Sequence, residues 1–317
     1  MPVRRGRKDV RKFPAKMHRT VSHARKTKRQ GMAFIAPSLL VIISVSVIPA
    51  VFLYVISLFD YTRGRTLDTA NWVGLENYTR LLSGADDNFW PAVGVTIAFV
   101  FATTVTTVLV GTVLAAAIDN LSRAKSFFTT LLILPLVMAP IFAGLIWRLM
   151  FNDLYGVLNA ILSPLGLSQH WLGTGPLAFA SVVIVETWQW TPFVAVIMFA
   201  GMQSIDQRPR EAAMLDGANS WQLFRHVTFP MLTPFFGLVL ALRVIDSMKI
   251  FDTAYILTQG GPGKSTETLG LMVWHYGLYQ TGWIGRASAV AILLLILVLI
   301  ISNFVTRYLH KAEMRES

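Results

Sequence analysis

The most informative stretch of this chain is Glu211-Ala212-Ala213-Met214-Leu215-Asp216-Gly217-Ala218, which continues to Val227-Thr228-Phe229-Pro230. It predicts a short helix with Glu211 near its start, because the helix dipole stabilises a carboxylate there. Gly217 would then supply a turn, and a second helical stretch would follow at 219–229. That stretch mixes Trp221 and other apolar side chains with polar ones. The loop should therefore expose apolar surface, which favours contact with a protein partner or the membrane interface.

Apolar runs lie on both sides of this loop and along the rest of the chain. Of the 317 residues, 54% are hydrophobic and 14% are charged, whereas about a quarter of the residues in a soluble domain are charged. A helix that crosses a membrane needs roughly 20 apolar residues. Six runs are long enough, at about 32–57, 93–118, 128–151, 178–201, 232–256 and 287–307. The sequence therefore predicts an all-α membrane protein with six transmembrane helices.

Two features of these runs bear on their interpretation. Pro135 and Pro140 lie inside one predicted span and Pro192 inside another, and membrane helices tolerate such prolines as kinks. The run at 32–57 follows basic residues, as a signal peptide does, but no small-x-small cleavage pattern follows it. We therefore expect this run to be retained as a helix.

The net charge of +11 is distributed unevenly along the chain. The two terminal segments and two alternate loops contain 20 Lys and Arg residues, of which 12 lie in 1–31, while the opposite loops contain five. Because Lys and Arg concentrate on the cytoplasmic side of membrane proteins, both termini should be cytoplasmic. The basic arm at 1–31 is better explained by topology and anionic lipid than by nucleic-acid binding.

Patterns typical of enzymes are missing or incomplete. Cysteine is absent, and the six histidines are scattered without metal-ligand spacing. The segment Gly260-Gly261-Pro262-Gly263-Lys264-Ser265-Thr266 looks like a phosphate-binding loop, but that motif needs a glycine where this chain has Thr258. We expect a tight turn there, and we expect no catalytic residue, no metal site and no cofactor in this chain.

Polar side chains share helical faces inside two of the predicted spans. Their spacing of three and four residues places each set on one side of a helix. The faces consist of Glu186, Gln189, Trp190 and Phe193 in the fourth span, and of Arg243, Ser247 and Ile250 in the fifth, with Asp246, Lys249 and Asp252 nearby. A charge at the bilayer centre costs about 2.5–3.5 kcal/mol, so these faces should line a cavity or the bundle interior. They either contact a solute, or Glu186 and Arg243 pair with each other or with a neighbouring subunit.

The loop quoted first resembles the E-A-A-x3-G-x9-I-x-L-P signature of importer permeases in the ATP-binding cassette (ABC) superfamily. Val227 and Phe229 stand where isoleucine and leucine are usual. The matching residues are Glu211, Ala212, Ala213, Gly217 and Pro230, with the extension Asp216-Gly217-Ala218. Other segments are similar to maltose-type and glycerol-phosphate-type permeases, namely Val73-Gly74-Leu75-Glu76-Asn77-Tyr78, Leu134-Pro135, Trp147, Lys249-Ile250-Phe251-Asp252 and Leu257-Thr258-Gln259-Gly260-Gly261-Pro262.

The resemblance implies a type I ABC importer permease in the bacterial cell membrane, with the loop as a coupling helix that docks on an ATPase subunit. It also implies four partners: a second permease, an ATPase dimer that carries ATP and Mg, an external or periplasmic solute-binding protein, and a sugar-like solute. The two polar faces resemble, in position only, those that contact sugar in the larger membrane subunit of the maltose permease.

The predicted organisation is a basic arm at 1–31, a first span with an external loop at 32–92, a core of five spans at 93–307 and a cytoplasmic tail at 308–317. The coupling loop occupies 202–231 of this core. Three alternatives remain open: an ion-coupled secondary transporter that uses intramembrane carboxylates, a non-transporting scaffold or receptor, and glycerol phosphate instead of sugar as the solute.

Overall fold

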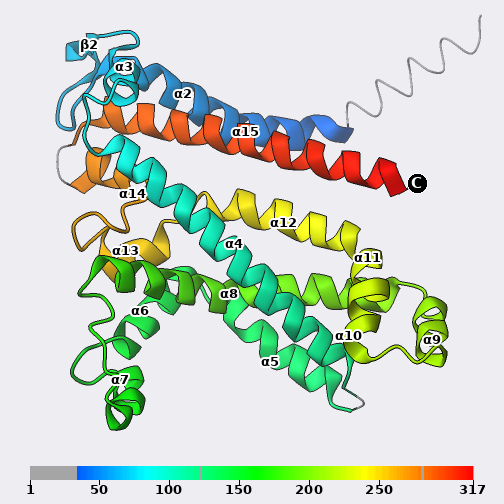
Figure 1. Ribbon diagram of the computed structural model, residues 1–317. Coiled ribbons are helices and arrows are strands. Elements are labelled where there is room, and N and C mark those ends of the chain that lie inside the picture. Colours follow the sequence, from blue (N-terminus) through cyan, green and yellow to red (C-terminus); the bar gives the residue numbers. More distant parts are fainter. Residues whose placement is uncertain (1–33, 122, 280–281, 317) are drawn as a thin grey trace, which may run out of the picture. The chain divides into compact units, whose positions relative to one another are not determined.

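Figure 1 shows the computed structural model of the chain, which describes residues 34–121, 123–279 and 282–316. The predicted basic arm at 1–31 lies outside the described residues. The chain divides into two compact units, 1–53 and 54–317. A helix at Phe34–Ser57 begins in the first unit. It contains a π-helical segment at Ile43–Val47, and its last part is α2 at Ile48–Ser57.

Within the described residues, four helices are long and apolar enough to cross a membrane. They are Phe34–Ser57, α4 at Phe89–Asp119, α8 at Gly175–Ser204 and the Ile284–Arg307 part of α15, which itself extends to Glu316. Two bent helix pairs raise the number to six if each pair forms one span. The chain is therefore mostly helical, as predicted, with four to six candidate spans.

The predicted span at 128–151 is broken into two helices, whereas the sequence predicted only a kink. The structure has α5 at Lys125–Val137 and α6 at Pro140–Met150, which are bent by 96° relative to each other. Between them Met138 and Ala139 are extended, both with ψ of 136°. Proline lacks a backbone N–H and disfavours the helical conformation in the residue before it, so Pro140 begins a new helix instead of kinking the old one.

The predicted span at 232–256 is interrupted as well. Helix α12 occupies Thr233–Ser247, and residues 248–251 leave the helical path before α13 begins at Asp252 and ends at Thr258. The hydroxyl of Thr268 donates a hydrogen bond to the carbonyl oxygen of Ile250 at 3.0 Å. A carbonyl that a continuous helix would use internally is thus satisfied from a distant segment.

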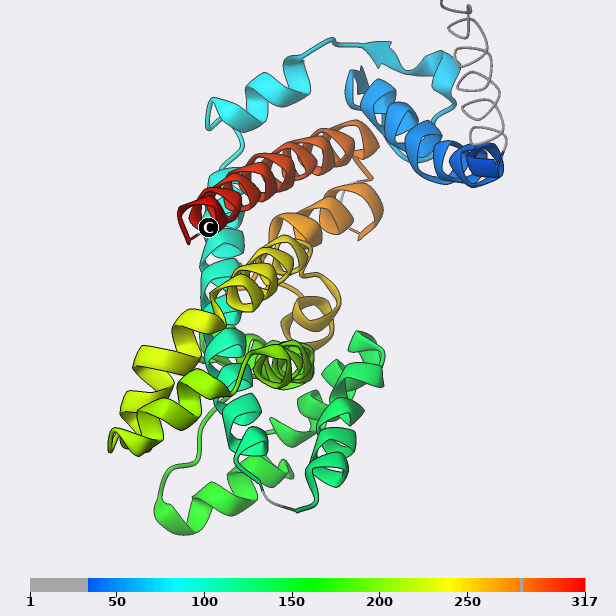
Figure 2. The same cartoon turned by 90° about the vertical axis from the view of Figure 1, so that its right-hand side faces the viewer.

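Helices α4 and α8 pack against each other over much of their length (Figure 1). Their close approach needs Gly111, because a Cβ atom there would lie 2.6 Å from the Cβ of Val194. Apolar side chains around Phe99 and around Met198 fill the interface. Helix α12 lies between α8 and α15 and contacts both (Figure 2).

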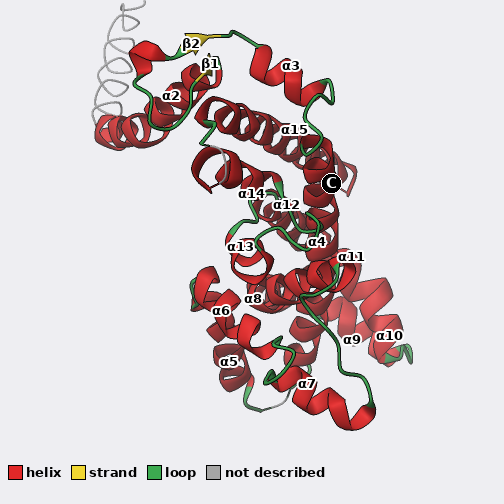
Figure 3. Ribbon diagram, turned by 90° about the vertical axis from the view of Figure 1, so that its left-hand side faces the viewer, coloured by secondary structure: helices red, strands yellow, loops and turns green. Residues whose placement is uncertain are grey.

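The short elements at the end of the helices where α4 begins are spread across Figure 3, from β1, β2 and α3 at the top to α7 near the bottom. They are β1 at Phe59–Asp60, which pairs antiparallel with β2 at Asn71–Trp72, the 3-10 turns at Leu67–Thr69 and Ser163–Leu165, α3 at Glu76–Leu82, α7 at Val157–Leu162, and α14 at Leu269–Trp274 with a π-helical segment at His275–Tyr279.

A buried hydroxyl links the π-helical segment at His275–Tyr279 to the turn between α3 and α4. Tyr276 donates to both carboxylate oxygens of Asp86, at 2.9 and 2.8 Å. Burial raises the pKa of the Tyr276 hydroxyl above its ordinary value, so the hydroxyl remains a donor into more alkaline conditions than a free tyrosine would. The predicted tight turn at 260–263 is present, with positive φ at Gly260 and Gly263.

Candidate functional site

The loop between α8 and α12 begins with α9, a helix at Arg208–Leu215. Pro209 stands in its first turn, where a missing N–H leaves no intrahelical bond unmade. Glu211 lies in the same turn, where its carboxylate interacts favourably with the helix dipole. The predicted short helix is therefore present.

Gly217 ends α9 with a φ of +82°, a conformation that glycine adopts without steric cost. Its N–H donates to the carbonyl of Met214 at 3.1 Å, and the N–H of Ala218 donates to the carbonyl of Ala213 at 3.0 Å. This pair of bonds is the Schellman arrangement, which satisfies the carbonyls that a helix end leaves free. The predicted glycine turn is thus a helix cap with a defined geometry.

The second half of the loop is helical, as predicted, but in three parts. Asn219 caps α10 at Ser220–Leu223 through reciprocal side-chain bonds with Gln222, both 2.9 Å long. A π-helical segment at Phe224–Thr228 and α11 at Phe229–Met231 follow, with Pro230 in the first turn of α11.

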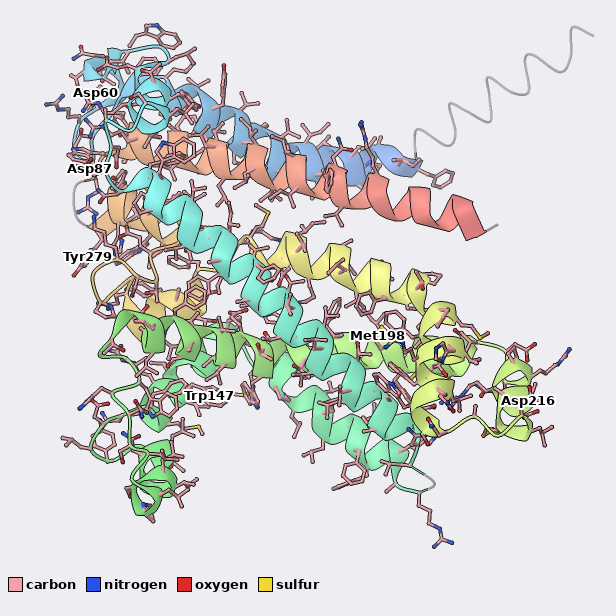
Figure 4. The ribbon with its side chains drawn as sticks, in the orientation of Figure 1. Asp60, Asp87, Trp147, Met198, Asp216 and Tyr279 are labelled. Carbon is pink, nitrogen blue, oxygen red and sulfur yellow. The ribbon has the colours of Figure 1, made fainter. Side chains whose placement is uncertain are left out.

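Apolar side chains are exposed at the tip of this loop. Leu215 is 89% exposed, Met214 and Trp221 are exposed as well, and α9 has no buried residue. Figure 4 shows Asp216 at the end of the helices opposite Asp87 and Tyr279. An exposed apolar patch of this kind marks a surface that another protein or a membrane covers.

Two polar side chains on the buried face of α8 bind the helix breaks described above. The hydroxyl of Thr253, on α13, donates to Oε1 of Glu186 at 2.5 Å. Nε2 of Gln189 donates to the carbonyl oxygen of Met138, between α5 and α6, at 2.9 Å. The break between α5 and α6 therefore offers a carbonyl oxygen that a continuous helix would use internally, while Thr253 binds Glu186 through its side chain.

Arg243 of α12 is 1% exposed, and its Nη1 donates to Oδ2 of Asp246 at 3.1 Å. Its guanidinium also lies 5.1 Å from the ring centroid of Trp190, which is a cation–π contact. Nζ of Lys249 is 3.9 Å from the other oxygen of Asp246. Arg243 thus pairs with Asp246 and not with Glu186.

Several buried polar atoms near these residues have no hydrogen-bond partner within the described chain. They are Nε and Nη2 of Arg243, Oε1 of Gln189, Oγ of Ser247 and Oγ1 of Thr191. Leaving such a group unsatisfied costs about 1–3 kcal/mol. These atoms are therefore available to a solute, to water or to a partner chain.

A cavity of about 140 Å³ lies beside this cluster. Its walls are formed by Pro140, Glu186, Trp190, Asp246, Lys249, Ile250, Phe251, Asp252 and Thr253. The structure thus brings together four of the eight predicted pathway residues: Glu186, Trp190, Asp246 and Ile250. The other four, Gln189, Phe193, Arg243 and Ser247, do not line this cavity, although Arg243 and Phe193 both contact the Trp190 ring.

Helical spacing in the sequence does not predict three of the residues that line the cavity, namely Thr253, Phe251 and Pro140. Thr253 lies beyond the break at 248–251, so periodicity counted from Arg243 does not place it. The available signal is the pair Asp252-Thr253, because such residues are typical of helix starts. Within the described residues, no three His, Asp or Glu side chains gather in a way that could hold a metal ion.

Residues 154–314 match the family described as binding-protein-dependent transport system inner membrane component. The chain is 35% identical to the trehalose/maltose transport system permease protein MalF of Thermococcus litoralis, over 90% of this chain and 94% of that protein. It is 32% identical to the sn-glycerol-3-phosphate transport system permease protein UgpA of Agrobacterium fabrum, over 77% of this chain and 82% of that protein. It is 31% identical to the multiple sugar-binding transport system permease protein MsmF of Streptococcus mutans, over 84% and 94%.

Solved structures show the same fold. A chain of a bacterial ABC transporter involved in the import of the acidic polysaccharide alginate matches with a TM-score of 0.78 and 18% identity, over 92% of this chain and 99% of that chain. A second structure, of an alginate transporter in complex with an alginate pentasaccharide-bound periplasmic protein, matches with a TM-score of 0.76 at 18% identity, over 88% and 93%.

Proposed function

Because the chain belongs to the family of binding-protein-dependent transport system inner membrane components, we propose that it forms, with a second permease subunit, the membrane pathway for a neutral sugar or sugar-like solute. The chain is a multi-pass cell-membrane protein and a transport subunit. ATP and Mg bind to a partner ATPase dimer, and a solute-binding protein outside the membrane delivers the solute. The chain itself uses no cofactor and binds no nucleic acid.

The main structural support for this proposal is the exposed helix α9. It ends in the glycine cap at Gly217 and leaves Leu215 almost fully exposed. A rigid, capped helix with an apolar tip is suited to insertion into a cleft on a partner protein. We assign ATPase docking to the residues of the matching signature, Glu211, Ala212, Ala213, Asp216, Gly217 and Pro230.

The buried polar cluster supports the solute pathway. The carboxyl groups of Glu186 and Asp246 in the cavity wall can bond to hydroxyl groups, Trp190 offers an aromatic face, and the buried Arg243, Gln189 and Ser247 lie behind this wall. A site with such groups discriminates against solutes that lack the matching hydroxyls, because its own polar atoms would then remain unpaired. Phe193 and Ile250 would shape the apolar part of this pathway.

The charges beside the cavity favour a neutral sugar over glycerol phosphate. Three carboxyl side chains, those of Glu186, Asp246 and Asp252, line the cavity together with one lysine, Lys249. Carboxylates repel a phosphate group, so this lining discriminates against an anionic solute.

For the topology, the proposal is six spans with both termini in the cytoplasm. Helices α5 and α6 would together form one span and α12 would supply the span after the coupling loop, while the uneven distribution of Lys and Arg would orient the chain. The units are then a basic arm at 1–31, a first span with its external loop at 32–92, a core at 93–307 that contains the loop at 202–231, and a tail at 308–317.

ATP binding would drive transport by favouring one arrangement of the permeases over another. A ligand shifts such an equilibrium only by its differential affinity for the two states. The ATPases would supply this difference by closing on ATP while α9 is docked. The pathway would then open to the side from which the binding protein delivers the solute.

Reconstitution in liposomes tests this function. The chain with its second permease, ATPase and binding protein should take up radiolabelled maltose or trehalose only when ATP is supplied to the ATPase side, and the chain alone should take up neither. Uptake by the chain alone under a proton or sodium gradient would identify a secondary transporter. Preference for glycerol 3-phosphate over both sugars would contradict the proposed solute class.

A further inference from the structure

Asp119, the last residue of α4, lies where three membrane helices meet the coupling loop. Its Oδ1 accepts a hydrogen bond from Nε2 of Gln203, near the end of α8, at 2.7 Å. Its Oδ2 accepts one from Nη1 of Arg210, on α9, at 3.2 Å. Its main-chain oxygen accepts one from Nζ of Lys125, the first residue of α5, at 2.8 Å. One residue thus connects α4, α5, α8 and α9.

Arg210 is the residue of α9 that bonds to the end of membrane helix α4. Along α9 all side chains are exposed except those of Arg210 and Ala213, which are half-buried. The side chains of Arg210 and Asp119 are only 18% and 10% exposed, so salt and water screen their attraction less than they screen a surface pair. By contrast, Arg208 and Asp206 are 90% and 56% exposed at 3.8 Å.

The backbone between α8 and α9 is not a continuous helix, although Nε2 of Gln207 donates to the carbonyl oxygens of Met202 and Ile205, both at 3.4 Å. Ile205 is extended, with ψ of 149°, so the helical hydrogen bonds of α8 stop before α9 begins. Apolar packing beside the ion pair is also incomplete, because a cavity of about 70 Å³ lies between Asp119, Arg210 and Phe224. The hydrogen bonds and the ion pair of Asp119 therefore connect α9 to the membrane helices where the helical backbone is interrupted and the apolar packing is incomplete.

We infer that Asp119 is a positioning residue that transmits movement of α9 to α4 and α8 through its ion pair with Arg210. This inference rests on the proposed function. Glu186 and Trp190 stand on α8, the helix whose end Asp119 holds through Gln203, so a displacement of α9 reaches the solute cavity along a single helix. Without the ion pair, α9 would still dock on the ATPase but would turn about the 205–207 link.

The cysteine-free chain allows a direct test in the assembled transporter. A Lys249→Cys variant serves as the reporter, because Lys249 is exposed in the cavity wall. The rate at which a charged maleimide labels this cysteine is measured without nucleotide and with ATP and vanadate. In the parent, nucleotide should change the rate about fivefold or more, the lower end of typical coupling. Asp119→Asn and Arg210→Gln should lose this change while the ATPase still co-purifies. Arg210→Lys should recover part of it.

Asp206→Asn and Arg208→Gln are the matched controls, because this exposed ion pair on the same segment should leave the nucleotide effect unchanged. A nucleotide effect in Asp119→Asn and Arg210→Gln equal to that of the parent would overturn the inference. Loss of ATPase co-purification in Arg210→Gln would also overturn it, because the residue would then serve docking itself. If the parent shows no nucleotide effect, the proposed function fails instead. If Asp119→Asn lowers insertion of the protein into the membrane, the Arg210 variants still allow the test, because Arg210 lies on an exposed helix outside the membrane spans.

Discussion

The coupling loop and the polar cluster of α8 and α12 both lack partners in this chain, but in opposite ways. In the loop the polar backbone is well satisfied, through the glycine cap of α9 and the reciprocal cap at Asn219, while apolar Leu215 is exposed. In the cluster the side chains are buried, while polar atoms of Arg243 and Gln189 are unpaired. Exposed apolar area is stabilised when another protein surface covers it. Unpaired polar atoms are instead satisfied by a small polar molecule or by a few hydrogen bonds from a neighbouring chain.

The largest expected effect is an all-or-none difference in access between the two ends of the molecule. A cysteine at Ser204, beside the coupling loop, should be protected from an impermeant thiol reagent in intact cells, and cysteines at Thr69 or Lys264 should react. The reason is the uneven distribution of Lys and Arg, which places the loop in the cytoplasm. Labelling at Ser204 from outside would contradict the assignment of the coupling loop as an ATPase contact, because an external loop could not reach a cytoplasmic ATPase.

Next in size is the replacement of the glycine that ends α9. Gly217→Pro should abolish ATP-dependent uptake and reduce ATPase co-purification, because proline cannot adopt a φ of +82° and lacks the N–H that bonds to Met214. Uptake normalised to membrane-inserted protein measures the effect.

Gly217→Ala provides the matched control. No atom lies within 4 Å of the position of an added Cβ, so its cost of about 1–2 kcal/mol comes from the left-handed backbone alone. We expect reduced but measurable uptake. Full uptake and co-purification in Gly217→Pro would contradict the role of the helix end in docking.

The polar cluster should give smaller, graded effects. Glu186→Gln and Arg243→Gln should each weaken transport roughly ten- to a hundredfold, because a hydrogen bond to a charged group contributes about 1.5–3 kcal/mol. Initial uptake rates over a range of solute concentrations test this. Since Glu186 binds Thr253 and Arg243 binds Asp246, we expect no recovery in the double variant. Recovery of protein level and uptake in the double would instead indicate a structural charge pair.

The smallest effect should come from the aromatic face of the cluster. Trp190→Ala removes a ring that lies 5.1 Å from the Arg243 guanidinium and lines the cavity. The ring orients the Arg243 guanidinium through a cation–π contact of about 0.5–2 kcal/mol, and full expression of that energy in solute binding corresponds to roughly a two- to thirtyfold rise in the half-saturating concentration. Basal ATP hydrolysis of the complex should persist. An unchanged half-saturating concentration would remove Trp190 from the solute pathway.

The sequence predicts the coupling loop better than the cluster, for a local reason. The start of α9 at Arg208 and its end at Gly217 depend on residues within one turn of each other, through the helix dipole and the left-handed glycine. The cluster joins α8 to Met138 and Thr253, which lie 51 and 67 positions from their partners along the chain. Helical spacing says nothing about such distant contacts.

By itself the sequence determined that the chain is a helical membrane protein, where its apolar runs lie, and that a capped short helix precedes Gly217, because hydrophobicity and local backbone preference act over a few turns. Only the tertiary structure decided that the runs at 128–151 and 232–256 break, since a break is stable only where distant groups satisfy the freed backbone. It also decided that Arg243 pairs with Asp246, and that Asp119 joins three membrane helices to α9. These contacts depend on where helices far apart in the sequence meet, which their periodicity does not specify.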